Sequence, residues 1–255
     1  MLNLNITTLP WDQRRDILIP GNASETIAFC VKHFLLAYHE AIKDHGAFYV
    51  ALSGGSTPKS IFQALTTAPL CNQIDWSKIH LFWSDERSVG PQDPDSNFHM
   101  AMESGFKKMP IPAGNIHRMQ AEEEIEKNAI AYQQKISSIV KNNSLDYIML
   151  GMGEDGHTAS LFPGTSALHE EKQLVVANWV PQKNTWRMTF TYPLIHLAKQ
   201  VVIYVIGDNK KEMLLSVWND HTHPHTYPVS FIGNSTHKAT WICDSLAASK
   251  IPTSQ

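Results

Sequence analysis

Three glycines and two carboxylates directly precede a single histidine in the middle of the chain. The segment 151–157 reads Gly-Met-Gly-Glu-Asp-Gly-His, so that Gly156 separates Asp155 from His157. Glycine lets the backbone approach a ligand closely, and a carboxylate beside an imidazole can fix its tautomer and raise its basicity. We therefore predict that His157 is a catalytic base oriented by Asp155. The alternative is a histidine that is hydrogen-bonded in a structural turn.

A second polar turn, Ser-Gly-Gly-Ser-Thr at 53–57, has the composition of an anion site. Its glycines allow backbone N–H groups to point inward, and Pro58 suits the first turn of a following helix, whose N-terminus favours an anion. The spacing matches neither the P-loop nor the dinucleotide fingerprint, which disfavours a nucleotide. A plain strand-to-helix turn is the alternative. The residues predicted to bind a single phosphate group are Gly54, Gly55, Ser56 and Thr57.

Further charged residues can complete a site for a phosphorylated ligand. In the third turn, Asp85-Glu86-Arg87, the carboxylates can orient a sugar hydroxyl or a histidine, and Arg87 can bind a phosphate or carboxylate bidentately. A solvated loop with local ion pairs is the alternative. Arg187 and Lys210 can supply positive charge for the phosphate, with Lys183 as a weaker candidate.

Each of the three turns follows a short apolar run that predicts a buried strand. These runs cover 47–52, 79–83 and 147–150. Because the carboxyl ends of parallel strands lie along one edge of an open sheet, where ligands bind, the three turns are expected to share one cleft.

The remaining pattern predicts one α/β domain over 1–255, with a mostly parallel open sheet, helices on both faces and a small β-rich lobe in the C-terminal half. Further strands are predicted at 174–179, 187–192, 200–206 and near 228–233. Helices are predicted from Asn22 or Ser24 to Gly46, at 58–67, 96–106 and 121–141, after Gly207, and as a short helix at 157–162.

Composition excludes several classes of protein. A formal charge of -3 argues against a nucleic-acid partner. The three scattered cysteines indicate a reducing compartment, and no apolar run reaches the length of a membrane span. No signal sequence is visible, which predicts a cytoplasmic protein. The alternating His221, His223 and His225 lack supporting ligands, so we predict neither a metal nor a cofactor.

Three segments together resemble the 6-phosphogluconolactonases, which are related to the glucosamine-6-phosphate deaminases. They are ALSGGSTP at 51–58, SDERSV at 84–89 with DPDSN at 93–97, and LGMGEDGHTASLFPG at 150–164. RMT at 187–189 and GDNK at 207–210 match more weakly. The segment 88–92 departs from the lactonase pattern, which often has Val-Pro and a histidine here.

The resemblance implies hydrolysis of 6-phosphogluconolactone to 6-phosphogluconate in the oxidative pentose phosphate pathway. It implies His157 as the base for water, a substrate site that includes Asp85, Arg87, Gly156, Arg187 and Lys210, and no metal. The expected partner is a small sugar phosphate, and the expected assembly is a monomer or weak homo-oligomer. Deaminases carry a glutamate where this chain has Phe162, which disfavours deamination. A non-catalytic sugar-phosphate-binding regulator is a further alternative.

Overall fold

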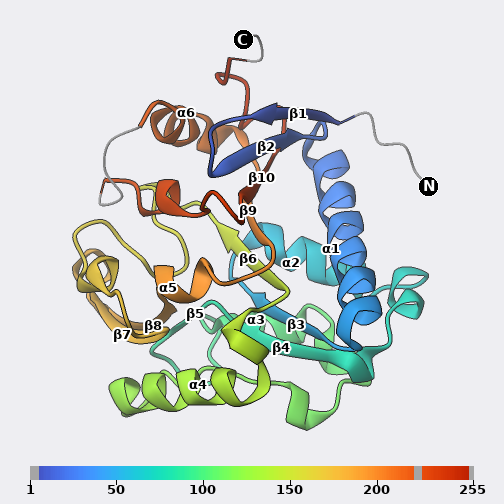
Figure 1. The fold of residues 1–255 in the computed structure, drawn as a ribbon, viewed down its shortest axis with the longest axis vertical. Helices are drawn as coiled ribbons and strands as arrows, with labels where there is room; N and C mark the ends of the chain where they lie inside the picture. The colour runs from blue at the N-terminus through green and yellow to red at the C-terminus, as the bar shows by residue number, and fades with distance from the viewer. Residues whose placement is uncertain (1–5, 221–225, 253–255) are drawn as a thin grey trace.

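The computed structural model describes residues 6–220 and 226–252, which form a large and a small sheet with flanking helices (Figure 1). The large sheet has the order β1-β2-β10-β9-β6-β3-β4. Its strands are β1 (Thr7–Pro10), β2 (Arg15–Ile19), β3 (Phe48–Leu52), β4 (Ile79–Trp83), β6 (Tyr147–Gly151), β9 (Val201–Val205) and β10 (Ala239–Cys243). From β2 to β4 all neighbouring strands are parallel, and β1 pairs with β2 antiparallel. The mostly parallel sheet that the sequence predicts is confirmed.

The small sheet is antiparallel and has the order β5-β8-β7. Its strands are β5 (Asp85–Arg87), β7 (Val175–Val180) and β8 (Thr185–Phe190). The predicted small β-rich lobe is confirmed. Its sheet also includes β5, whose residues 85–87 are predicted as a turn from the sequence. The helices are α1 (Ala23–His45), α2 (Ser56–Leu65), α3 (Asn97–Glu103), α4 (Ile125–Ile139), α5 (Tyr192–Ile195) and α6 (Lys211–Asn219).

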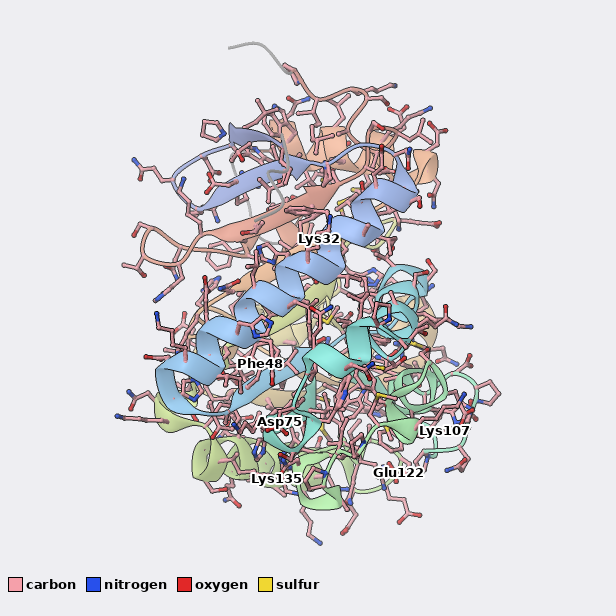
Figure 2. The ribbon with its side chains drawn as sticks, turned by 90° about the vertical axis from the view of Figure 1, so that its right-hand side faces the viewer. Lys32, Phe48, Asp75, Lys107, Glu122 and Lys135 are labelled. Carbon is pink, nitrogen blue, oxygen red and sulfur yellow. The ribbon has the colours of Figure 1, made fainter. Side chains whose placement is uncertain are left out.

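Helix α1 shows how local sequence and packing agree. Asn22 caps its N-terminus in a capping box with Glu25, and Gly46 ends it in a left-handed conformation. Its buried face includes Phe34 and Tyr38, whose rings meet Phe48 of β3 edge-on at 5.3 and 5.8 Å between centroids. Figure 2 shows α1 in front of the large sheet, with Phe48 labelled beside it. These contacts hold the strand that leads into the turn at 53–57.

Two sequence predictions about local structure are wrong. Residues 157–162 form no helix, because Ala159 has a φ of 47° and a β-bridge joins Thr158 to Leu161. The segment near 228–233 forms a short 3₁₀ helix, Pro228–Phe231, since proline at its first position favours a helical turn and cannot donate to a sheet. The last strand is instead β10, and the hairpin of β1 and β2 was not predicted.

No helix within the described residues is long and apolar enough to cross a membrane. The single-domain organisation over 1–255 stays a prediction.

Candidate active site

The ends of four neighbouring strands form one wall of a cavity of about 220 Å³. The strands β9, β6, β3 and β4 lie side by side, and their carboxyl ends lead into the polar turns. The predicted residues that line this first cavity are Gly54, Gly55, Ser56, Thr57, Asp85, Arg87, His157 and Lys210. The structure thus brings together segments that are more than 150 residues apart in the sequence. Asp155, Gly156 and Arg187 do not line this cavity.

His157 is held through one of its two ring nitrogens. Its Nδ1 lies 2.5 Å from Asp155 Oδ1, which also accepts a hydrogen bond from the His157 backbone N–H at 3.1 Å. Burial alone would raise the pKa of Asp155, but the hydrogen bond and charge of His157 lower it below its ordinary value. A carboxylate on Nδ1 favours the tautomer with a proton there and a lone pair on Nε2. The pair therefore has the geometry of an oriented base.

Gly156 allows the turn between these two residues but does not face the cavity. Its φ is +77°, and a Cβ at this position would lie 2.8 Å from the ring of Tyr227. The Gly156 carbonyl accepts a hydrogen bond from the N–H of Val229. Close packing against the segment 227–229 therefore requires glycine here. A substrate contact by Gly156 stays a prediction.

Asp85 is buried at the start of β5, just after β4, with its carboxylate fixed from two sides. Asn97 Nδ2 donates to Oδ1 at 3.1 Å, and Ser160 Oγ donates to Oδ2 at 2.7 Å. Asn97 in turn lies against Gly54, where a Cβ would come within 2.0 Å of Asn97 Oδ1. Asn97 and Ser160 are not among the predicted site residues, although both lie inside the segments that carry the resemblance.

Glu86 has a structural role that the charged segment 85–87 does not indicate from sequence alone. Its carboxylate accepts hydrogen bonds from the backbone N–H groups of Asn97 and Phe98 at the start of α3, and from Ser96 Oγ. Burial raises the pKa of Glu86 above its ordinary value, although these bonds oppose the shift. Glu86 anchors α3 to β5, while Asp85 and Arg87 on either side of it face the cavity.

Arg87 and Arg187 lie directly opposite each other on β5 and β8. They line a second cavity of about 530 Å³ together with His157, Phe162, Lys183 and Thr185. Arg87 and His157 line both cavities. Arg87 donates to the Asp95 carbonyl at 2.7 Å. Arg187 therefore lies outside the first cavity, in the lining of the second one, opposite Arg87.

Burial lowers the pKa of Arg187, with Asp85 opposing the shift and Arg87 adding to it. The Nε atoms of both arginines are buried and have no hydrogen-bond partner among the described residues. Two guanidinium groups opposite each other on neighbouring strands repel, and an anion between them could accept hydrogen bonds from both Nε atoms.

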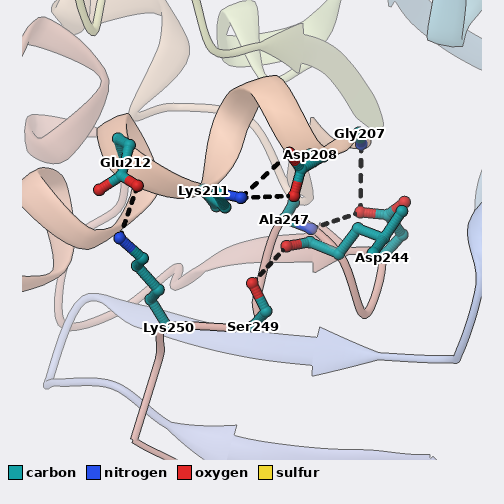
Figure 3. A network of polar contacts seen from close by, with 9 residues as sticks. Gly207, Asp208, Lys211, Glu212, Asp244, Ala247, Ser249 and Lys250 are labelled. Atoms are coloured by element: carbon teal, nitrogen blue, oxygen red, sulfur yellow. Dashed lines mark hydrogen bonds and ion pairs between the residues drawn. The ribbon is translucent and has the colours of Figure 1, made fainter.

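Lys210 reaches the first cavity from a turn that Asp244 holds in place. Asp244 Oδ1 accepts hydrogen bonds from the N–H groups of Gly207 and Ala247 at 3.1 and 2.8 Å, as Figure 3 shows. Gly207 has a φ of +109°, which lets the chain turn from β9 into the short helix Asp208–Lys210. Lys210 Nζ donates to the Met152 carbonyl at 2.9 Å, so its charge is held beside the His157 turn.

The turn at 53–57 presents the start of α2 to the same cavity. Gly55 is the N-cap residue with a φ of +104°, and no side chain of the described residues caps the helix. Within the described part of the chain, the N–H groups of the first turn therefore have no side-chain cap, a condition that suits a bound anion. Ser56 and Thr57 add hydroxyl groups at the cavity wall.

Among residues 6–220 and 226–252, no three His, Cys, Asp or Glu side chains are grouped so that they could hold a metal ion. The histidines at 221, 223 and 225 lie outside the described residues. The absence of a metal and of a cofactor stays a prediction.

An oriented histidine, a helix N-terminus and several cations at the carboxyl edge of a parallel sheet define an α/β enzyme with a site for a small anionic substrate. Residues 21–241 match the family of glucosamine-6-phosphate isomerases/6-phosphogluconolactonase. The chain belongs to this family, as the resemblance of its motifs predicted.

Individual relatives match nearly the whole chain. A 6-phosphogluconolactonase of Chlamydia pneumoniae is 41% identical over 92% of this chain and 90% of its own length. One from Nostoc sp. is 37% identical over 93% of this chain and 99% of its own length. The structure of the 6-phosphogluconolactonase from Trypanosoma cruzi superimposes with a TM-score of 0.82 at 25% identity, covering 96% of this chain and 98% of that one.

Proposed function

We propose that this protein hydrolyses 6-phosphogluconolactone to 6-phosphogluconate with a water molecule that His157 activates. The chain is a lactone hydrolase, since relatives at 36–41% identity, matched over most of their own length, are named 6-phosphogluconolactonase. The observation that supports the detailed proposal is the His157–Asp155 pair, which holds Nδ1 at 2.5 Å and leaves Nε2 for a water molecule. Arg87 and His157 line both cavities, so a substrate that occupies both would have its reacting carbon beside them.

The substrate phosphate would lie against the start of α2 at 54–57. Lys210 lines the same cavity, and Arg187 lines the adjoining one. Together with the helix N-terminus they offset the charge of a phosphate monoester. Arg87 would either join them or hold the lactone ring. Asp85, fixed by Asn97 and Ser160, would accept a hydrogen bond from a sugar hydroxyl.

The proposed reaction needs one proton carrier. The oxygen of water attacks the C1 carbonyl carbon while His157 Nε2 takes a proton from that water. The bond between C1 and the ring oxygen then breaks, and the imidazolium returns the proton to the departing oxygen. The carboxylic acid that forms loses its proton to solvent. Such base catalysis contributes about 10²–10⁴-fold to the rate.

The test is an assay in which the lactone is generated enzymatically and its disappearance is compared with spontaneous hydrolysis. His157→Ala should lower kcat by about 10²–10⁴-fold and leave product binding intact, because only the base is removed. A folded His157→Ala variant with wild-type turnover would contradict the role of His157. Release of ammonia from glucosamine 6-phosphate would instead identify a deaminase. Tight binding of 6-phosphogluconate by the wild-type protein without lactone turnover would identify a regulator.

The location, metal use, assembly and substrate class of the enzyme belong to the same proposal. We infer a cytoplasmic, metal-independent enzyme that acts as a monomer or weak homo-oligomer on a small sugar phosphate. The three cysteines are free, which agrees with a reducing compartment. Turnover should be insensitive to a strong chelator, and an activity that is lost with chelator and restored by a divalent ion would contradict metal independence.

A further inference from the structure

The imidazole of His157 is enclosed more tightly than its bond to Asp155 requires. The ring of Phe162 stacks on it with 3.9 Å between centroids and 17° between planes. Aromatic pairs usually prefer offset or edge-on arrangements at 4.5–7 Å. A nearly parallel stack at a shorter distance therefore indicates that the surrounding chain, and not the pair itself, sets this geometry.

Gly153 bounds the same ring. A Cβ built on Gly153 would lie 2.0 Å from His157 Nδ1 and 2.2 Å from Cε1, far inside contact distance. The Gly153 N–H also donates to the His157 carbonyl at 2.8 Å, which ties the two backbones together. The imidazole thus occupies a slot formed by Phe162, the bare Cα of Gly153 and the Asp155 carboxylate. Among the described residues, these contacts engage Nδ1 and leave Nε2 of the imidazole without a hydrogen-bond partner.

Phe162 is itself rigidly placed. Its side chain is 2% exposed. Its carbonyl accepts a hydrogen bond from Thr165 Oγ1 at 2.8 Å, and that hydroxyl accepts one from Asn178 Nδ2 at 3.0 Å. Asn178 belongs to β7, so the small sheet fixes the position of Phe162. The position of the imidazole is thereby connected to the sheet that carries Arg187.

We propose that Phe162 is a positioning residue, whose ring holds His157 in the slot against Gly153 and so directs Nε2 toward the substrate. This inference rests on the proposed function, in which His157 is the base. Phe162 takes no part in the proton transfer in this role and acts on the reaction through the imidazole, although it also lines the second cavity. A displacement of about 1 Å at a reacting group can cost about 100-fold in rate, so the loss of the flat ring should be visible in kcat.

The first arm of the test replaces the flat ring. Phe162→Leu should lower kcat by about 10- to 100-fold and change KM far less, because the base moves while the charged and polar substrate contacts stay. Phe162→Tyr keeps the ring and should restore kcat. The matched control is Phe106→Leu, since Phe106 is equally buried but packs against Phe62 and Trp76 outside the site. It should lose stability and keep kcat.

The second arm narrows the slot from its other boundary, and it also serves if Phe162→Leu fails to fold. Gly153→Ala should displace the imidazole and lower kcat by a similar factor without changing KM. Gly114→Ala is the control, because a Cβ there meets no atom within 4 Å.

Nitrogen NMR of ¹⁵N-histidine-labelled protein reads the ring state without using activity. The chain has 13 histidines, and a His157→Gln spectrum identifies the signal. The wild type should show one tautomer, with the proton on Nδ1, while Phe162→Leu and Gly153→Ala should show mixed or exchange-broadened signals. A folded Phe162→Leu protein with one tautomer and wild-type kcat overturns the positioning role. Mixed tautomers in Phe162→Leu, together with normal turnover in His157→Ala, would support positioning and refute the proposed base.

Discussion

The opposed arginines of the small sheet lead to a prediction about stability and binding together. Arg187 faces Arg87 across β5 and β8, and its Nε is buried without a partner among the described residues. Like charges opposite each other in a sheet cost up to about 1 kcal/mol, and a buried unpaired donor costs about 1–3 kcal/mol. The attraction of Asp85 offsets part of this cost. We therefore expect Arg187→Met to stabilise the unliganded protein by about 1 kcal/mol, or about 2–4 °C in Tm.

The bound protein should respond in the opposite way. If Arg187 holds the phosphate, its loss removes about 1.5–3 kcal/mol of charge-assisted hydrogen bonding and raises Kd by about 10- to 100-fold. At a product concentration of about 100 times the wild-type Kd, the wild type gains about 2.7 kcal/mol from binding, whereas the variant gains about 0.4–1.4 kcal/mol. The order of the two melting temperatures should therefore reverse when 6-phosphogluconate is added.

Thermal unfolding with and without 6-phosphogluconate measures both effects. Arg118→Met is the matched control, because it removes a charge that is paired with Glu122 at 2.8 Å, away from both cavities. Its product-induced rise in Tm should equal that of the wild type. The reasoning is refuted if Arg187→Met melts lower than the wild type without ligand, or if its product-induced rise in Tm is undiminished.

Three further changes test other parts of the structure. Asp155→Asn should lower kcat by about 10- to 100-fold at constant KM, because the amide can donate to the imidazole and favour the wrong tautomer. Burial, followed by the charge of His80, lowers the pKa of His117 to about 4, so urea unfolding should show stability falling from pH 6.5 toward pH 4 as the unfolded chain takes up the proton. Gly54→Ala should cost about 1–3 kcal/mol and reduce turnover, since its Cβ would displace Asn97.

Each of these has a result that would contradict it. An unchanged kcat in Asp155→Asn would mean that the tautomer is set elsewhere. Equal urea midpoints at pH 7 and pH 5, or an equally steep loss in His117→Phe, would show that His117 does not carry the acid sensitivity. For Gly54→Ala, wild-type stability would show that the Asn97 side chain moves aside freely. The space beside Gly90 is open, so Gly90→Ala is the matched control for stability.

Local sequence signals predicted the parts of the site that follow strands of the large sheet. The apolar run 79–83 coincides with β4, and 147–150 falls within β6, so the turns after them were placed correctly. The predicted helix at 157–162 is wrong although its residues tolerate a helix. Hydrogen bonds from Ser160 to Asp85 and Thr189 require another backbone path. Those partners lie far away in the sequence, and no local pattern reports them.

The contacts of Phe162 and Arg187 depend on pairing that forms only in the folded chain. β5 pairs with β8, which lies about a hundred residues further along. A three-residue charged segment has no strand signal of its own, so the sequence indicated the chemistry of Arg87 but not the arginine opposite it. The sequence shows that Phe162 cannot transfer a proton. It does not show that Phe162 stacks on His157, because that contact depends on the path of the turn after β6.

Ser84 connects the large sheet to the small sheet at the candidate active site. Its N–H donates to the Leu52 carbonyl of β3, and its carbonyl accepts from Phe190 of β8, both at 2.8 Å. One residue is therefore bonded to both sheets, and the chain passes from β4 into β5 at this point. Because Asp85 follows directly, the large sheet positions the helix N-terminus and His157 turn, while the small sheet supplies Arg87 and Arg187. A cleft built across this junction lets a base from the large sheet and the opposed cations of the small sheet face one substrate.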